Sequence, residues 1–156
     1  GELLKLESGI DANHIPYKGA SPASVDLLAG HVSFMVNNMQ SALPYIKDGR
    51  LKALAVTSSE RLSVLPKVPT FKELGYKGLQ ISGWYGLLGP AGMSPEIVKQ
   101  LNSQITLILK EKEVIDQIRA DGAEIKVGSP KEFSDRINSD MIKWSEVVKR
   151  ADVKGQ

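Results

Sequence analysis

The sequence predicts an α/β fold in which βαβ units build a largely parallel sheet and a helical C-terminal part follows. Two observations carry this prediction. Short apolar runs alternate with amphipathic segments through residues 1–82, which is typical of strands that alternate with helices. Beyond residue 90, apolar side chains recur every three or four positions, which is typical of helices.

The first part of the chain is expected to contain the strands. Helices are expected at residues 1–8, 21–28 and 39–47, and strands at residues 13–17, 32–36, 51–57 and 79–88. Gly9 closes the first helix. Pro22 is expected at the first position of the second helix, where its missing N–H costs nothing. Thr70 and Glu73 have the spacing of a capping box after a loop at residues 59–69.

The second part is expected to be mostly helical. Helices are expected at residues 95–120, in two pieces, and at residues 129–150, with a short strand at residues 124–127. Ser94 and Ser129 are their predicted caps. Their apolar faces are formed by Ile97, Leu101, Ile105 and Ile108, and by Phe133, Ile137, Met141 and Trp144. Faces this wide need a sheet to cover, and this part has one short strand, so we expect the chain to be a fragment of a larger protein.

Composition excludes several classes of site. Hydrophobic residues make up 42% and charged residues 24%, as in ordinary globular domains. Cysteine is absent, which excludes disulfides, thiolate metal sites and a cysteine nucleophile. Net charge is +2 with the basic residues spread along the chain, so nucleic acid binding is not indicated. His14 and His31 lack an acidic or second histidine partner at ligand spacing, so no metal is expected.

Sequence motifs point to neither catalysis nor a cofactor. The serines have no G-x-S-x-G context, and the glycines form neither a P-loop nor a dinucleotide fingerprint. We therefore expect no catalytic residues and no cofactor. No apolar run approaches the length of about 18 residues that a membrane span needs.

The turn at Lys18, Gly19, Ala20 and Ser21 is the first candidate binding site. A strand, a glycine turn and a helix start follow one another here. The start of a helix offers unpaired N–H groups and a positive dipole end, which favour a carboxylate or phosphate. Gly19 allows close backbone approach, and Lys18 adds a cation. The alternative is a plain connection between strand and helix with an exposed lysine.

Two further segments are weaker candidates. Asn38 and Ser41 follow a predicted strand, and ligands bind at the carboxyl ends of parallel strands. Simple N-capping by asparagine is the alternative. Trp84 lies between glycines and is a candidate for lining a cleft, or equally for packing in the core.

Several motifs in order resemble the substrate-binding receptors of tripartite tricarboxylate transporters, also called the Bug or TctC family. The matching segments cover nearly the whole chain: His14-Ile-Pro-Tyr-Lys-Gly-Ala-Ser-Pro-Ala, Asp26-Leu-Leu-Ala-Gly30, Ser41 through Ser58, Leu65-Pro-Lys-Val-Pro-Thr70, Trp84-Tyr-Gly-Leu-Leu-Gly-Pro-Ala-Gly92, Pro95-Glu-Ile-Val, and Phe133 through Trp144. No single motif is specific, but their order is.

The resemblance implies a periplasmic binding protein of the type II class, with two domains that close over a small carboxylate. It assigns residues 1–82 to most of the second domain, residues 83–92 to a hinge crossover, and residues 93–156 to helices of a first domain whose strands are missing. The ligand contacts it implies fall on Lys18, Gly19, Ala20 and Ser21, and on Asn38 and Ser41. Asn37 and Gln40 depart from the residues common in the family, an acidic residue and a proline, and bear on specificity.

The implied function is that of an extracytoplasmic, periplasmic receptor which is not an enzyme. It captures a small carboxylate and delivers it to the membrane components of a transporter. Two alternatives remain open: an enzyme acting on a carboxylate or phosphate substrate at the Lys18 turn, and a non-binding fragment that persists as an assembly. The wide apolar helix faces also predict a homodimer through the C-terminal helices.

Overall fold

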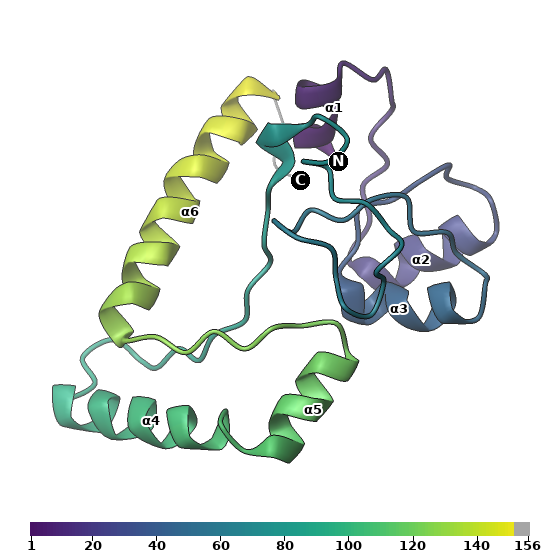
Figure 1. Ribbon diagram of the computed structural model, residues 1–156. Coiled ribbons are helices and arrows are strands. Elements are labelled where there is room, and N and C mark those ends of the chain that lie inside the picture. Colours follow the sequence, from purple (N-terminus) through teal and green to yellow (C-terminus); the bar gives the residue numbers. More distant parts are fainter. Residues whose placement is uncertain (152–156) are drawn as a thin grey trace. The chain divides into compact units, whose positions relative to one another are not determined.

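The computed structural model describes residues 1–151, and the elements found there are helical (Figure 1). The α-helices are α1 (Glu2–Ser8), α2 (Ala20–Leu28), α3 (Met39–Lys47), α4 (Pro95–Ile108), α5 (Lys112–Ala120) and α6 (Pro130–Arg150), with a short 3-10 helix η1 (Lys77–Leu79). Within residues 1–151, no helix combines the length and the apolar character that crossing a membrane requires. The helix bounds agree with the helices predicted from the sequence, with shifts of one or two residues at their ends.

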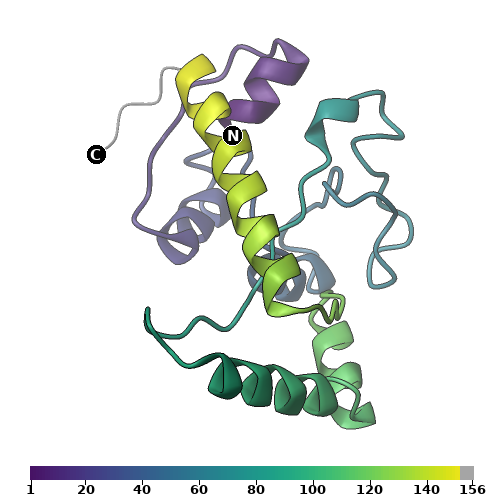
Figure 2. The ribbon, with the colours of Figure 1, turned by 90° about the vertical axis from the view of Figure 1, so that its left-hand side faces the viewer.

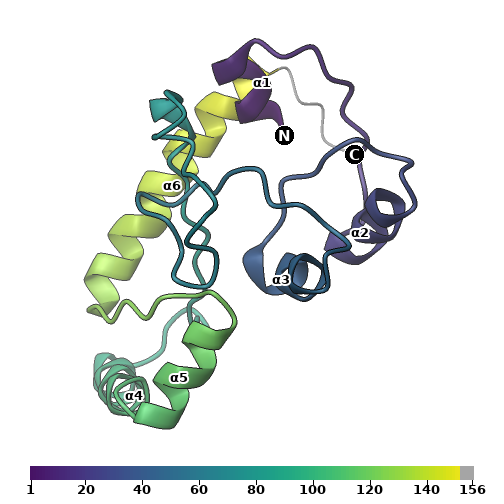
Figure 3. The same ribbon diagram turned by 45° about the vertical axis from the view of Figure 1, so that its right-hand side comes forward.

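The chain divides into two compact units. The first unit is Gly1–Gly83 with Asp121–Ala123, and the second is Trp84–Ala120 with the chain from Glu124 onward. In the first unit, α1 packs against η1. Helix α2 packs against α3, as Figure 3 shows. Its buried apolar residues are Leu3, Ala23, Leu43, Val56 and Leu79.

The structure does not confirm the predicted sheet: among residues 1–151, one isolated parallel bridge joins Val56 and Thr70. The Val56 N–H donates to the Pro69 carbonyl at 2.9 Å, and the Phe71 N–H donates to the Val56 carbonyl at 2.9 Å. The other segments expected as strands carry no strand assignment. A parallel ladder needs a neighbouring strand along its whole length, and only this single bridge provides one here. The sheet therefore remains a prediction.

The caps show how local sequence starts the helices. Ser94 Oγ accepts from the Ile97 N–H at 3.3 Å, and Ser129 with Glu132 forms a complete capping box. Thr70 and Glu73 also make both capping-box hydrogen bonds, at 2.7 and 3.1 Å, but only turns follow them. The capping pair therefore folds locally even where no α-helix continues.

Helix α2 begins earlier than the sequence predicts. Gly19 is its N-cap, so Pro22 is the third helical residue and not the first. The reason is the φ of +123° at Gly19, which is a non-helical conformation that only glycine adopts readily. The shift has no cost in hydrogen bonds, because the first four N–H groups of a helix have no partner within it.

In the second unit, α4 packs against α6, which is one long uninterrupted helix in Figure 2. The apolar faces predicted for these helices are largely exposed. Ile97 is 49% exposed and Met141 is 66% exposed, and α4 has no buried residue.

Candidate functional site

The turn from Lys18 to Ser21 presents backbone N–H groups at the start of α2. Ala20 and Ser21 occupy the first two helical positions, so their N–H groups point away from the helix and lack partners within it. Gly19 and Ser21 are exposed, and Ala20 is half-buried. No atom lies within 4 Å of where a Cβ on Gly19 would be, so the surrounding space is open. An anion has room to approach this turn. Lys18, the first residue of the turn, is exposed.

The turn is tied to its own helix by side chains that the sequence reasoning missed. The Tyr17 hydroxyl donates to Asp26 Oδ2 at 2.6 Å, and His31 Nδ1 lies 3.2 Å from Asp26 Oδ1. Two hydrogen bonds lower the pKa of Asp26: the larger contribution comes from Tyr17 and the smaller one from His31. The same bond to Asp26 raises the pKa of Tyr17. A tyrosine directly before a glycine turn and an aspartate within the following helix are the signal that the sequence offered.

Both histidines have a carboxylate neighbour, contrary to the sequence prediction. His14 Nδ1 lies 3.4 Å from Glu2 Oε1, and His31 faces Asp26. The local register of α1 and α2 produces these pairs, which spacing along the chain did not indicate. Within residues 1–151, no group of three or more histidine, aspartate or glutamate side chains is placed to hold a metal ion.

The second candidate segment forms the start of α3. Asn38 is the N-cap, yet its side chain makes no capping hydrogen bond. The preceding Asn37 does not cap the helix either, because its Oδ1 accepts from the N–H of Asn38 itself, at 2.8 Å. Asn38 and Ser41 are both exposed. Their polar side chains are thus presented at a second helix start.

A hydrogen bond links the middle of α2 to the residue that precedes the cap of α3. Asn37 Nδ2 donates to Ser24 Oγ at 3.4 Å, and Ser24 is 5% exposed. Ser24 lies in the second turn of α2, and Asn37 directly precedes the cap of α3. The starts of α2 and α3 therefore belong to one packed pair of helices within the first unit, which Figure 3 shows side by side.

Trp84 lies in the second unit, and its side chain contacts residues of helix α6 in the same unit. Its indole N–H donates to Asp140 Oδ2 at 2.7 Å, and Arg136 Nε donates to the same oxygen at 2.9 Å. The Trp84 ring meets Phe133 edge to face, with centroids 5.1 Å apart. Two hydrogen bonds lower the pKa of Asp140: the larger contribution comes from Trp84 and the smaller one from Arg136. Trp84 is 41% exposed, so the ring surface is what it offers to a ligand.

Comparison with known proteins finds relatives of this sequence. The profile of the tripartite tricarboxylate transporter family receptor matches residues 1–153. Protein BugT of Bordetella pertussis is 39% identical over 153 residues, which are 98% of this chain and 47% of that protein. The UPF0065 protein in the clcB-clcD intergenic region of Pseudomonas knackmussii is 33% identical over 94% of this chain and 87% of that protein.

Solved structures share the fold. The structure titled R. palustris Rpa4515 with adipate matches 97% of this chain and 50% of its own, with a TM-score of 0.88 and 31% identity. The MatC protein of Rhodopseudomonas palustris with bound malate matches 94% of this chain and 51% of its own, with a TM-score of 0.79 and 30% identity. The chain spans about half the length of BugT and of these structures. With its profile match over residues 1–153, the chain belongs to the tripartite tricarboxylate transporter receptor family, the TctC family.

Proposed function

We propose that this chain forms one wall of a carboxylate-binding site in a periplasmic receptor. The family match supports the receptor function, and the structural relatives with adipate and malate support a carboxylate as the ligand class. The N–H groups at Gly19, Ala20 and Ser21 bind one carboxylate oxygen pair, and Asn38 and Ser41 supply further polar contacts.

The observation that carries this proposal is the hydrogen bond between Asn37 and Ser24. It joins Ser24, in the middle of α2, to Asn37, the residue directly before the N-cap of α3. Each N-terminus stabilises a nearby negative charge by about 0.3–1 kcal/mol. In the proposed site both helix starts act on the same anion, so their effects on it add, while a single helix start would leave it weakly held. Lys18 contributes a charge that solvent and salt screen.

The wider assignment follows from the family. Residues 1–82 would form most of the second domain of a periplasmic binding protein, residues 83–92 the hinge crossover, and residues 93–156 a helical part of the first domain. Residues 152–156 of this last range lie outside the part of the chain that the structure describes. The receptor acts by differential affinity for a closed state, which the membrane components of the transporter recognise. No chemical step is needed, so we assign no enzymatic activity. Trp84 would contact the ligand through its exposed ring.

Chemical-shift mapping of the ¹⁵N-labelled chain tests the proposal, because it detects weak binding and locates it. Malate, adipate and, as a neutral control, glycerol are titrated to millimolar concentrations. We expect the two acids to shift the amide resonances of Gly19, Ala20 and Ser21 and those of Asn38 and Ser41. Shifts that are absent, or equal for glycerol, would refute the proposal.

A pair of glycine variants provides the control for backbone strain. Gly19→Val blocks the turn, and Gly49→Val introduces a similar strain at the end of α3, because both glycines have a positive φ and open surroundings. We expect Gly19→Val to abolish the shifts caused by malate and Gly49→Val to preserve them. Equal loss in both variants would mean that binding depends on general stability and not on this turn.

A further inference from the structure

Tyr17, Asp26 and His31 form a hydrogen-bonded chain that brackets helix α2. Tyr17 precedes the Lys18 turn, Asp26 lies inside the helix, and His31 follows its end. The hydroxyl-to-carboxylate distance of 2.6 Å is that of a strong charge-assisted hydrogen bond. The His31 N–H of the backbone also donates to the Asp26 carbonyl at 2.9 Å, which fixes the position of the histidine.

The Tyr17–Asp26 hydrogen bond connects the segments on the two sides of the Lys18 turn. Tyr17 is the residue where the backbone enters the turn, and Asp26 belongs to the helix that leaves it. Between them lies Gly19 at a φ of +123°, a residue whose backbone is free to adopt many conformations. The Tyr17–Asp26 bond removes much of this freedom, because it fixes the two ends of the segment relative to each other.

We propose that Asp26 is a positioning residue for the carboxylate site: it holds the Tyr17 hydroxyl and thereby keeps the N–H groups of Ala20 and Ser21 in the conformation that binds an anion. This inference rests on the proposed function. It assigns a role to a residue that does not touch the ligand, since Tyr17 and the turn lie between Asp26 and the anion.

The charge of Asp26 does not oppose this role. Asp26 is six residues beyond Ala20, which is about 9 Å along the helix axis. This separation is close to the Debye length of about 8 Å at physiological ionic strength, so its repulsion of an anion at the helix start is strongly screened. The facing His31 offsets part of the charge when it is protonated. The charge of Asp26 is therefore compatible with a role in holding the Tyr17 hydroxyl.

The test compares three variants of the hydrogen-bonded pair with two controls, each of which changes one side chain. Tyr17→Phe and Asp26→Ala break the bond, and Asp26→Asn retains an uncharged acceptor. Tyr45→Phe is the control for loss of a tyrosine hydroxyl, and Asp48→Asn is the control for loss of an exposed aspartate in the same unit. Malate titrations followed by amide shifts, ligand-free spectra and thermal melting are recorded for each.

We expect Tyr17→Phe and Asp26→Ala to weaken malate binding about tenfold, which corresponds to about 1.4 kcal/mol. Asp26→Asn should weaken malate binding less, because the amide oxygen still accepts a hydrogen bond from the Tyr17 hydroxyl. The double variant Tyr17→Phe/Asp26→Ala should bind malate about as weakly as the two single variants, since each substitution alone already removes the same hydrogen bond. In the ligand-free protein, the amide resonances of Gly19 and Ala20 should move in both bond-breaking variants and stay in place in the two controls.

The outcomes separate this inference from the proposed function. If the wild-type spectra respond to neither malate nor adipate, the proposed function is wrong and this inference falls with it. If the wild type binds malate and Tyr17→Phe binds equally well, the inference is overturned while the proposed function stands. Unchanged ligand-free resonances of Gly19 and Ala20 in Tyr17→Phe would also overturn it. Tyr17→Phe keeps the test decisive if Asp26→Ala fails to fold.

Discussion

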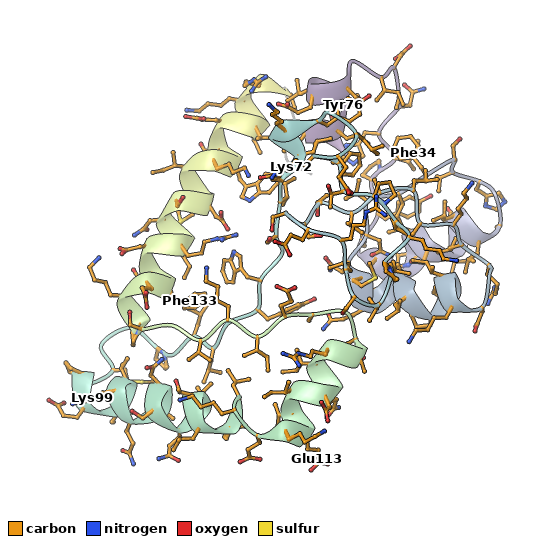
Figure 4. All side chains as sticks on the ribbon, viewed as in Figure 1. Phe34, Lys72, Tyr76, Lys99, Glu113 and Phe133 are labelled. Carbon is orange, nitrogen blue, oxygen red and sulfur yellow. The ribbon has the colours of Figure 1, made fainter. Side chains whose placement is uncertain are left out.

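Gly86 lies against the first turns of α6, and a methyl group there would collide with Phe133. A Cβ on Gly86 would be 2.1 Å from Phe133 Cζ, and 2.7 and 2.8 Å from the two neighbouring ring carbons. Figure 4 labels Phe133 where its ring projects from α6. Because the φ of Gly86 is not in the positive region, Gly86→Ala introduces this collision without backbone strain. It therefore tests the packing contact alone.

The size of the effect follows from the distances. Carbon atoms make favourable contacts at about 3.5–4.0 Å, so the tip of the Phe133 ring must move by about 1.5 Å. The ring is not free to move without loss, because it meets Trp84 edge to face at 5.1 Å. Overpacking costs about 1–3 kcal/mol, and the half-buried position of Phe133 favours the lower part of this range. We expect a loss of about 1–1.5 kcal/mol, or a fall in Tm of about 2–6 °C.

Urea denaturation followed by tryptophan fluorescence measures this loss. Gly83→Ala is the matched control, because no atom lies within 4 Å of its Cβ position and its φ is not positive. In the Phe133→Ala background, Gly86→Ala should cost almost nothing, since the colliding ring is gone. A full penalty for Gly86→Ala in that background, or an equal penalty for Gly83→Ala, would refute the packing argument.

Three further predictions concern binding, pH and assembly. Gly19→Val should weaken carboxylate binding far more than Lys18→Ala in calorimetric titration, because the first blocks the backbone and the second removes a screened charge; the reverse order would make Lys18 the anchor. The pKa of Asp140 is lowered, so its bond to Trp84 contributes stability above the unfolded pKa of about 3.9 and loses it as pH falls through the lower folded value. Trp84 fluorescence in a Trp144→Phe variant should therefore be constant from pH 7 to 5 and change below about pH 4; a transition above pH 5 would contradict this. The exposed apolar faces of α4 and α6 should cause self-association, and light scattering that shows a monomer at working concentration would contradict that prediction.

The helices were predictable because their signals are local. Ser94 and Ser129 sit directly before prolines at the first helical position, and both serine hydroxyls accept the expected backbone N–H. Gly9 ends α1 in the left-handed conformation that its position indicated. Each of these features depends on residues within about one helical turn, so the sequence pattern contains the information.

The side-chain pairs and the sheet depend on contacts that local patterns do not encode. Trp84 and Asp140 are 56 residues apart, and only folding brings the indole to α6. The Tyr17–Asp26 bond needs the exact register of α2, which the expected position of Pro22 placed wrongly. The parallel sheet needs strands from distant parts of a chain as neighbours. Among residues 1–151, the Val56–Thr70 bridge is the extent of that pairing.

The proposed carboxylate site has a strength limit that follows from its construction. The two helix starts supply about 0.3–1 kcal/mol each, and each charge-assisted hydrogen bond adds about 1.5–3 kcal/mol. Binding also costs the ligand's translational and rotational freedom, at least about 4 kcal/mol. One wall with two or three such bonds therefore nets only a few kcal/mol, which places its affinity around the millimolar level, where 1 mM corresponds to about −4 kcal/mol. Tighter binding requires a second wall that excludes water, because the same hydrogen bonds are stronger in a low dielectric. Under the proposed function, closure of a second wall would therefore set the affinity, and the turn that Asp26 positions would set where the anion lies.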